Sequence, residues 1–333
     1  MDVVIRGEGV AARACAQLLE AAGFGVAVDS AHRPSLAAIM VSESTQGLFR
    51  DVFGPTDLFH GLRRIKKRIV AWGPDAKPVA LPHSAVVLSE DALLNRLKRN
   101  RSAIDLEGGI EAERTIIASR PPPPSSTEHH FGSRIAAAQA VNLKNGRDIS
   151  ACLVESLENG WLFLIPTDRE TGWLLTVGGS PESLLSRSRL VGEQLQGTIG
   201  VAAKFPAYPR ISWPFCGPGW MACGTAALAF DPLCGDGAGY AIREAILASA
   251  VVRAAAKGAE AVDVVMHYRK RLLIGFQRHL DVCREFYASG HRGPWWDAEL
   301  GLVCRGFEWC ARELESTTKF RYQLRGFELQ PAE

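Results

Sequence analysis

The apolar positions near the N-terminus follow the order strand, helix, strand. Apolar residues run from Val3 to Ile5, and two glycines follow them. An alanine-rich stretch with helical spacing then leads to a second apolar run at Val26–Val28. This order predicts a βαβ unit, which is the building block of a parallel sheet.

The pattern changes in the middle of the chain. Between Arg134 and Gly179, apolar and polar positions alternate in short runs such as RIAAAQAVNL and GWLLTVGG. Such alternation predicts roughly three or four antiparallel strands, and hence a second sheet. A glycine-rich stretch then leads into a long helix at Tyr240–Lys257, and the pattern beyond it is mostly helical.

The turn after the first strand carries a dinucleotide-binding fingerprint. Gly7, Gly9 and Ala12 form a G-x-G-x-x-A string between strand and helix. Gly7 makes the turn, Gly9 admits a pyrophosphate to the backbone, and Ala12 lets helix and strand pack closely. Asp29 ends the second strand, about 20 residues further on, where a carboxylate accepts ribose hydroxyls. The fingerprint alone does not separate NAD from FAD.

A second glycine cluster lies late in the chain. A short strand leads to Gly224, and Gly235, Gly237 and Gly239 stand just before the long helix. Backbone amides crowd at a helix N-terminus here as well, and such a place favours the negative edge of a reduced flavin. Two such sites, one early and one late, suit a long cofactor that crosses the molecule.

Three stretches resemble a known family. They are the fingerprint, VSESTQGLFRDVFG at Val41–Gly54, and GTAALAFDPLCGDGAGYAIREA from Gly224 onward. They are similar to FAD-dependent monooxygenases of the p-hydroxybenzoate-hydroxylase fold, within the branch that holds flavin-dependent halogenases. The strongest likeness is to flavoprotein hydroxylases that mature quinone cofactors by acting on peptidyl tryptophan. VESLENGWLFLIP and ERTIIASR resemble further segments of that branch.

This resemblance implies the fold class and the domains. The expected fold is α/β, with a Rossmann-type FAD-binding domain, an inserted antiparallel β-sheet substrate domain and a helical C-terminal region. The FAD-binding domain would be discontinuous, formed by residues 1–120 and 217–257. The substrate domain would span residues 134–216 and the helical region residues 258–333.

The resemblance also implies the site. FAD would lie with its adenosine half along the first fingerprint and its flavin half along the second cluster. The residues implied for the flavin half are Ser44, Thr45, Gly224, Thr225, Gly235, Gly237 and Ala238. Thr225 stands where the family usually has an aspartate. The Asp231–Pro232 turn would lie beside the flavin ring, which makes Asp231 and Pro232 the candidate catalytic residues.

Hydroxylation and halogenation make different demands on the protein. The halogenase signature W-x-W-x-I-P is represented by Trp161-Leu-Phe163-Leu-Ile-Pro, with Phe163 in place of the second tryptophan. Halogenases also need a lysine, and Lys66 and Lys67 lie in a basic run that is typical of a solvated surface. A hydroxylase needs no such lysine, because the flavin itself carries the oxygen. We therefore expect hydroxylation of an electron-rich aromatic ring, such as an indole in a small molecule or a peptide.

Two other functions stay open at this point: a flavin-dependent tryptophan halogenase, and a non-catalytic flavin- or nucleotide-binding partner protein. Only one dinucleotide fingerprint is present, and FAD would occupy it. Electrons would therefore come from transient NAD(P)H docking or from a separate flavin reductase.

Composition argues against several other classes of protein. The chain has 333 residues, with 38 Lys and Arg against 36 Asp and Glu, so a nucleic-acid-binding protein is not expected. The 8 cysteines form no C-x-x-C pair, which favours reduced thiols in a cytoplasmic protein and no zinc site. The adjacent His129 and His130 would point opposite ways on an extended segment, so no metal is expected. No apolar run suggests a leader peptide or a membrane span.

Overall fold

The structure is a computed structural model that describes residues 2–30, 34–54, 57–97, 114–123, 125–315 and 320–332. Among them, five strands form a first sheet in the order β14-β15-β6-β1-β2. Their bounds are β1 Val3–Arg6, β2 Val26–Asp29, β6 Arg114–Ile117, β14 Cys216–Gly217 and β15 Trp220–Ala222. β1 runs parallel to both β2 and β6, and helix α1, Val10–Ala21, joins β1 to β2. The predicted βαβ unit is thus confirmed.

A second sheet has eight strands in the order β12-β8-β11-β10-β9-β4-β5-β3 within the described residues. The strands are β3 Ile39–Ser42, β4 Arg63–Ala71, β5 Val79–Leu88, β8 Ile135–Leu143, β9 Ala151–Leu157, β10 Gly160–Pro166, β11 Thr171–Gly178 and β12 Leu195–Pro206. β8 to β11 are four antiparallel strands, as the alternating pattern predicts. β9 and β10 are buried along their whole length, because they lie at the centre of the sheet.

The second sheet also takes in strands from the N-terminal part of the chain. β4 pairs with β9 in parallel, from Lys67 opposite Ala151 to Ala71 opposite Glu155, and β5 and β3 follow at the edge. The family resemblance implies that residues 1–120 and 134–216 belong to different domains. These boundaries stay a prediction, but one continuous sheet crosses between the two segments.

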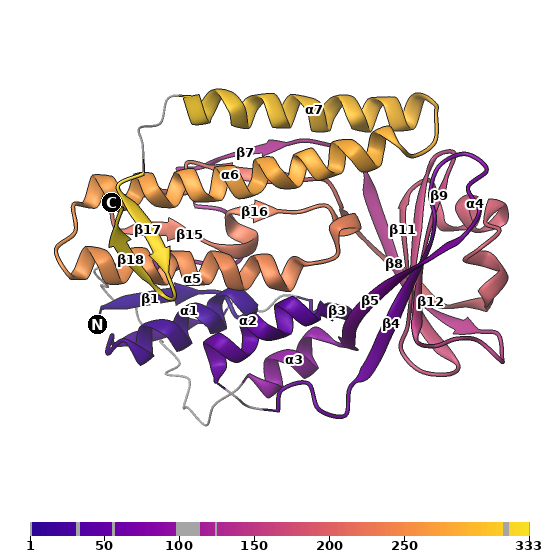
Figure 1. The fold of residues 1–333 in the computed structure, drawn as a ribbon, viewed down its shortest axis with the longest axis horizontal. Coiled ribbons are helices and arrows are strands. Elements are labelled where there is room, and N and C mark those ends of the chain that lie inside the picture. The colour runs from indigo at the N-terminus through magenta and orange to yellow at the C-terminus, as the bar shows by residue number, and fades with distance from the viewer. Residues whose placement is uncertain are drawn as a thin grey trace.

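The remaining described helices pack on both larger sheets. They are α2 Glu43–Phe53, α3 Glu90–Arg96, α4 Pro181–Arg187, α5 Gly237–Ala256, α6 Ala261–Ala288 and α7 Pro294–Glu315. α4 lies against β10 of the eight-stranded sheet (Figure 1). α5 packs against α1, and α7 lies along α6, as Figure 1 shows. The helical C-terminal pattern is confirmed, and the chain then closes with a hairpin of β17, Tyr322–Arg325, and β18, Glu328–Pro331. None of the described helices is long and apolar enough to cross a membrane.

A small third sheet connects the two larger parts. It contains β16 Leu228–Ala229, β13 Arg210–Trp213 and β7 Thr127–His130, in that order. The eight-stranded sheet lies at the opposite end of the molecule from the chain termini (Figure 1). The segment between β16 and α5, residues 230–236, therefore runs from the third sheet to the N-terminus of α5.

Candidate functional site

The turn after β1 has the geometry that its glycines predict. Gly7 has φ of +128°, which favours glycine, and a Cβ there would lie 2.7 Å from Ser119 Oγ. Its N–H donates to the carbonyl of Asp29 at 2.8 Å. α1 begins after Gly9, and no side chain caps its first turn. The first N–H groups of α1 thus have no side-chain acceptor, as an anion-binding helix N-terminus requires.

Asp29 lies at the end of β2, opposite Arg6 at the end of β1. Arg6 Nε is 3.8 Å from Asp29 Oδ2, and the two side chains are 61% and 59% exposed. Solvent screens this pair, so it holds the carboxylate only weakly. Asp29 is therefore accessible to a hydroxyl donor at the edge of the sheet.

The two glycine-rich segments meet in the fold although they are far apart in sequence. Gly224 has φ of +56°, and a Cβ on it would lie 2.8 Å from the Cβ of Ala11 on α1. Ala12, the last position of the fingerprint, is 1% exposed. Small residues on α1 thus let the Gly224 turn approach the helix closely, which places both clusters on one side of the molecule.

Helices α2 and α5 begin close together. Ser42 caps α2 by accepting a hydrogen bond from the N–H of Thr45 at 3.2 Å. The Thr45 hydroxyl donates to Asp236 Oδ1 at 2.5 Å, and Arg243 pairs with Asp236 at 2.9 Å. Thr45 is buried, whereas Ser44 is exposed with its Oγ 3.0 Å from Ser42 Oγ. Thr45 thus lies next to the second glycine cluster, as the family resemblance implies.

Two of the predicted glycines, Gly237 and Gly239, lie in the first turn of α5, and a Cβ on Gly239 would collide with the Asp236 carboxylate. Gly235 has φ of +61°, and a Cβ on Gly237 would have no atom within 4 Å. Asp236 precedes the first residue of α5 without capping it by its side chain. Ala238, the last predicted contact, is partly buried in the first turn. This end of α5 shares its glycines with the beginning of α1 but differs from it in the carboxylate of Asp236, which lies against the first turn and pairs with Arg243.

A cation that sequence reasoning missed faces this end of α5. Arg68 Nη2 on β4 lies 3.6 Å from the position that a Cβ of Gly235 would take. The Arg68 Nε atom is buried and has no hydrogen-bond partner. Arg68 is part of the basic run that contains Lys66 and Lys67. Alternation would place it on the same face as Lys66, and the register shift in β4 between Ile65 and Lys67 has no signal in the sequence.

The two lysines of that run are placed differently. Lys67 Nζ pairs with Asp148 at 2.7 Å, and Lys66 is exposed. The hydrogen bond from Lys67 is the main cause that lowers the pKa of Asp148 to about 2. Lys67 is therefore engaged in a half-exposed ion pair on the sheet.

The turn at Asp231 is held by a buried charged cluster. Arg134 donates to Asp231 Oδ2 from Nε at 2.8 Å and from Nη2 at 2.6 Å, and it also pairs with Glu299 of α7. The Tyr287 hydroxyl donates to the same oxygen at 2.9 Å. The Asp231 N–H donates to His279 Nε2 at 2.9 Å. Each of these side chains comes from a distant segment, so no local pattern in the sequence indicates the cluster.

Burial and neighbouring negative charges have opposite effects on the pKa of Arg134, whereas both raise the pKa of Tyr287. Burial disfavours the Arg134 cation, but Tyr287, Asp231 and Glu299 together raise its pKa above its ordinary value. Burial, and then the negative charge of Asp231, raise the pKa of Tyr287 well above its usual range. Tyr287 therefore remains a protonated donor, and Arg134 remains charged at any working pH.

The Gly224 turn is held from behind by an acid. The Gly224 N–H donates to Glu244 Oε2 at 2.7 Å, and Glu244 lies on the buried face of α5. Burial raises the pKa of Glu244 well above its ordinary value and so favours its protonated form. The neighbouring Thr225 is exposed, and its carbonyl accepts from Arg210 at 3.1 Å. A single acid in an otherwise apolar helical run was the signal that sequence reasoning passed over.

Comparisons with known proteins support the fold. No protein-family model and no curated protein sequence matches the chain. Among solved structures, the peptidyl tryptophan dihydroxylase QhpG, essential for tryptophylquinone cofactor biogenesis, matches with a TM-score of 0.76 at 19% identity, covering 99% of this chain and 86% of its own. The chain has the p-hydroxybenzoate-hydroxylase-like fold. The resemblance and the fold class predicted from the motifs are therefore confirmed.

Two further structures extend this likeness. The flavin-dependent halogenase CmlS matches with a TM-score of 0.76 at 16% identity, covering 94% of this chain and 71% of its own. The 2,6-dihydroxypyridine-3-hydroxylase from Arthrobacter nicotinovorans matches with a TM-score of 0.64 at 12% identity, covering 88% and 93% respectively. Hydroxylases and a halogenase thus share one architecture with this chain, and at these identities the likeness concerns the fold.

Proposed function

We propose that the protein is an FAD-dependent oxidoreductase that hydroxylates an electron-rich aromatic ring. The observation that carries the proposal is the contact of the Gly224 turn with Ala11 in the first turn of α1, beside the helix α5 that packs against α1. A cofactor with a nucleotide at one end and a flavin at the other suits this arrangement. The hydroxylases and halogenases of the same fold add support.

The described residues fit FAD. The pyrophosphate would lie at the beginning of α1 beside Gly9, with Gly7 shaping the turn and Ala12 packed behind it, and Asp29 would hold the ribose. Gly224 and Thr225 would face the ribityl chain. Around the flavin end would lie Ser44, Thr45, Gly235, Gly237 and Ala238. When bound, FAD supplies the electron transfer and the oxygen activation that no protein side chain provides.

The protein's own part is to position and to exclude water. The Arg134 guanidinium fixes the Asp231 carboxylate, and Asp231 Oδ1 in turn accepts from the Leu233 N–H at 2.8 Å. Asp231 therefore acts as a positioning residue that shapes the turn, and Pro232 would present the rigid surface beside the flavin. Arg68, with its unpaired Nε, would place a positive charge near the edge of the ring that gains negative charge on reduction.

Hydroxylation is favoured over halogenation by the surroundings of the lysines. Lys67 is paired with Asp148 and Lys66 is exposed, so neither is held in an apolar tunnel. Trp161 of the signature segment is fully buried and donates to the Tyr287 hydroxyl at 3.3 Å. Trp161 thus belongs to the core that supports the Asp231 turn.

The substrate we propose is an aromatic compound such as an indole, in a small molecule or in a peptide. QhpG acts on peptidyl tryptophan, which supports this choice. The electrons would come from NAD(P)H that docks transiently or from a separate flavin reductase, because the fingerprint at α1 serves FAD.

The first test is the absorption spectrum of the purified full chain. We expect a flavin spectrum that Gly9→Val removes, because a side chain there would meet the pyrophosphate. Thermal unfolding of the variant serves as the control for its folding. A chain that takes up NAD and not FAD would overturn the proposal.

The second test separates the two chemistries. Reduced FAD, oxygen, and chloride or bromide are supplied with tryptophan-containing candidates, and product masses are measured. We expect products heavier by one or more oxygen atoms. A halogenated product that disappears in Lys66→Ala or Lys67→Ala would assign the protein as a halogenase instead. Flavin that cycles with no product from any candidate would favour the non-catalytic binding protein.

A further inference from the structure

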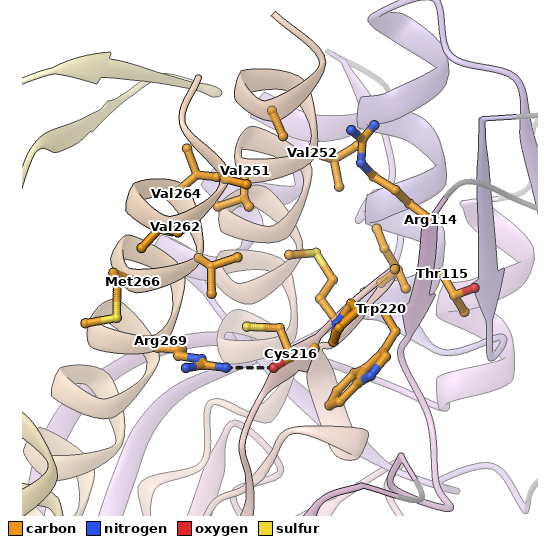
Figure 2. A pocket seen from close by; sticks show the side chains of 18 residues that line it. Arg114, Thr115, Cys216, Trp220, Val251, Val252, Val262, Val264, Met266 and Arg269 are labelled. Atoms are coloured by element: carbon orange, nitrogen blue, oxygen red, sulfur yellow. Dashed lines mark hydrogen bonds between the residues drawn. The ribbon is translucent and has the colours of Figure 1, made fainter. Parts of the chain in front are cut away.

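A cavity of about 540 Å³ lies between the first sheet and the helices α5 and α6. Figure 2 shows its wall of valines on the two helices and the indole of Trp220 on the strand side. Apolar side chains such as Val251, Val252 and Met266 form most of this wall. The volume falls within the range of roughly 300–1,000 Å³ that is typical of small-molecule sites.

This cavity is separate from the proposed flavin site. It is lined by Arg114, Thr115 and Ile116 of β6 and by the C-terminal half of α5. The fingerprint turn at Gly7 instead lies next to Ser119, beyond the other end of β6, and the flavin end lies at the N-terminal end of α5 at Gly237. The two sites thus share a strand and a helix but lie at opposite ends of them.

The charges in the cavity wall have one sign. Arg114 and Arg269 line it, and none of its described lining residues is acidic. In Figure 2 the two guanidinium groups lie at opposite ends of the apolar wall. The nearest acid before Arg269 on α6 is Asp263, and it forms an ion pair with Arg321 at 3.0 Å. The cavity therefore complements a negative charge that the described lining does not supply.

Arg269 has donor capacity left. Its Nη2 donates to the Cys216 carbonyl at 2.9 Å, which fixes the guanidinium against β14 (Figure 2). Its Nε atom is buried and has no hydrogen-bond partner. Because Nε is shielded from the cavity, a ligand there would reach the terminal nitrogens of the partly buried guanidinium, and a carboxylate oxygen is the acceptor that such a group binds best.

We propose that this cavity binds an amphipathic carboxylate as a second small-molecule site. The apolar body of the ligand lies between Trp220 and the valines, and its carboxylate pairs with Arg269. The site is independent of the flavin chemistry, because none of the residues assigned to FAD lines it.

Isothermal titration of the purified full chain with octanoate tests this proposal. We expect saturable binding of one equivalent, at least tenfold weaker binding of 1-octanol, and at least tenfold weaker octanoate binding by Arg269→Gln. Arg278→Gln is the matched control, because Arg278 is an exposed arginine on the same helix outside the cavity. It should bind octanoate as the wild type does.

A second variant covers the case that Arg269→Gln fails to fold. Met266→Trp fills the cavity from a partly exposed position and should abolish binding while thermal unfolding stays cooperative. The proposal is overturned by the absence of saturable binding, by equal affinities for octanoate and octanol, or by unchanged affinity in a folded Arg269→Gln. Octanoate that displaces bound flavin would also overturn it, since the ligand would then occupy the other site.

Discussion

The N-termini of α1 and α5 serve the same proposed purpose but are held in different ways. At α1, backbone geometry and small side chains define the turn, and a charge pair beside it, Arg6 with Asp29, is mostly exposed. At α5, polar side chains from other segments hold the chain that leads into the helix. Arg134 binds Asp231, and Thr45 donates to Asp236. The conformation of a glycine turn can thus be determined by neighbouring residues or by charged side chains from distant segments. Only a turn of the second kind loses its conformation when a distant side chain is replaced.

We expect the largest effect when the buried ion pairs of Arg134 with Asp231 and Glu299 are broken. Arg134→Met would leave Asp231 and Glu299 buried without their cation, and such uncompensated charge costs about 3–5 kcal/mol in free energy of unfolding. Urea denaturation measures this loss. Arg187→Met is the control, because its pair with Glu158 is exposed and should contribute less than about 1 kcal/mol. Equal losses in both variants would contradict the assigned difference.

A glycine substitution tests the close contact between the two regions. Gly224→Ala adds a methyl group 2.8 Å from Ala11 at a positive φ, and we expect a loss of about 2–3 kcal/mol with loss of bound flavin. Gly237→Ala has open space around the new methyl group and should leave unfolding within about 0.5 kcal/mol of wild type. Thermal unfolding and flavin absorbance are measured together. A stable, flavin-replete Gly224→Ala would show that the contact is not required.

A smaller effect is expected at the α2–α5 junction. Thr45→Val removes the hydroxyl that donates to Asp236 while keeping the side-chain shape, and we expect a loss of about 1.5 kcal/mol and weaker flavin retention. Arg243 continues to hold the carboxylate, which limits the loss. Ser44→Ala, at the exposed neighbouring position, should change stability by less than about 0.5 kcal/mol. The comparison uses chemical denaturation followed by flavin titration.

The smallest effect depends on pH. The pKa of Glu244 is raised by burial, so its stabilising contribution is complete below the ordinary glutamate pKa and is lost as pH rises through the folded-state pKa. Glu244→Gln stays neutral and can still accept from the Gly224 N–H. We therefore expect the variant to gain stability relative to wild type as pH rises from 5 to 9. Melting temperatures across that range check the sign, and a constant difference would show that Glu244 does not titrate in this way.

The sequence allowed the parts of the fold that depend on local pattern to be predicted. Periodicity predicts the βαβ unit, the alternating strands from β8 to β11 and the long helix α5. The fingerprint predicts that Gly7 makes a turn, and its φ is indeed positive. The parallel pairing of β4 with β9 could not be predicted, because it joins segments with no pattern in common. The same holds for Arg134, whose partners Asp231 and Glu299 of α7 become its neighbours only after the chain has folded.

The pairing of β4 with β9 has a consequence for how the chain assembles. Lys67 and Ala151 are neighbours in one sheet, so the central strands cannot be completed until both halves of the chain have been synthesised. Contacts of such long sequence separation slow folding, since a large loop must close first. A cut between Trp72 and Lys77 would leave neither fragment with a complete sheet. Limited proteolysis there should yield fragments that stay associated under native conditions and do not refold when separated.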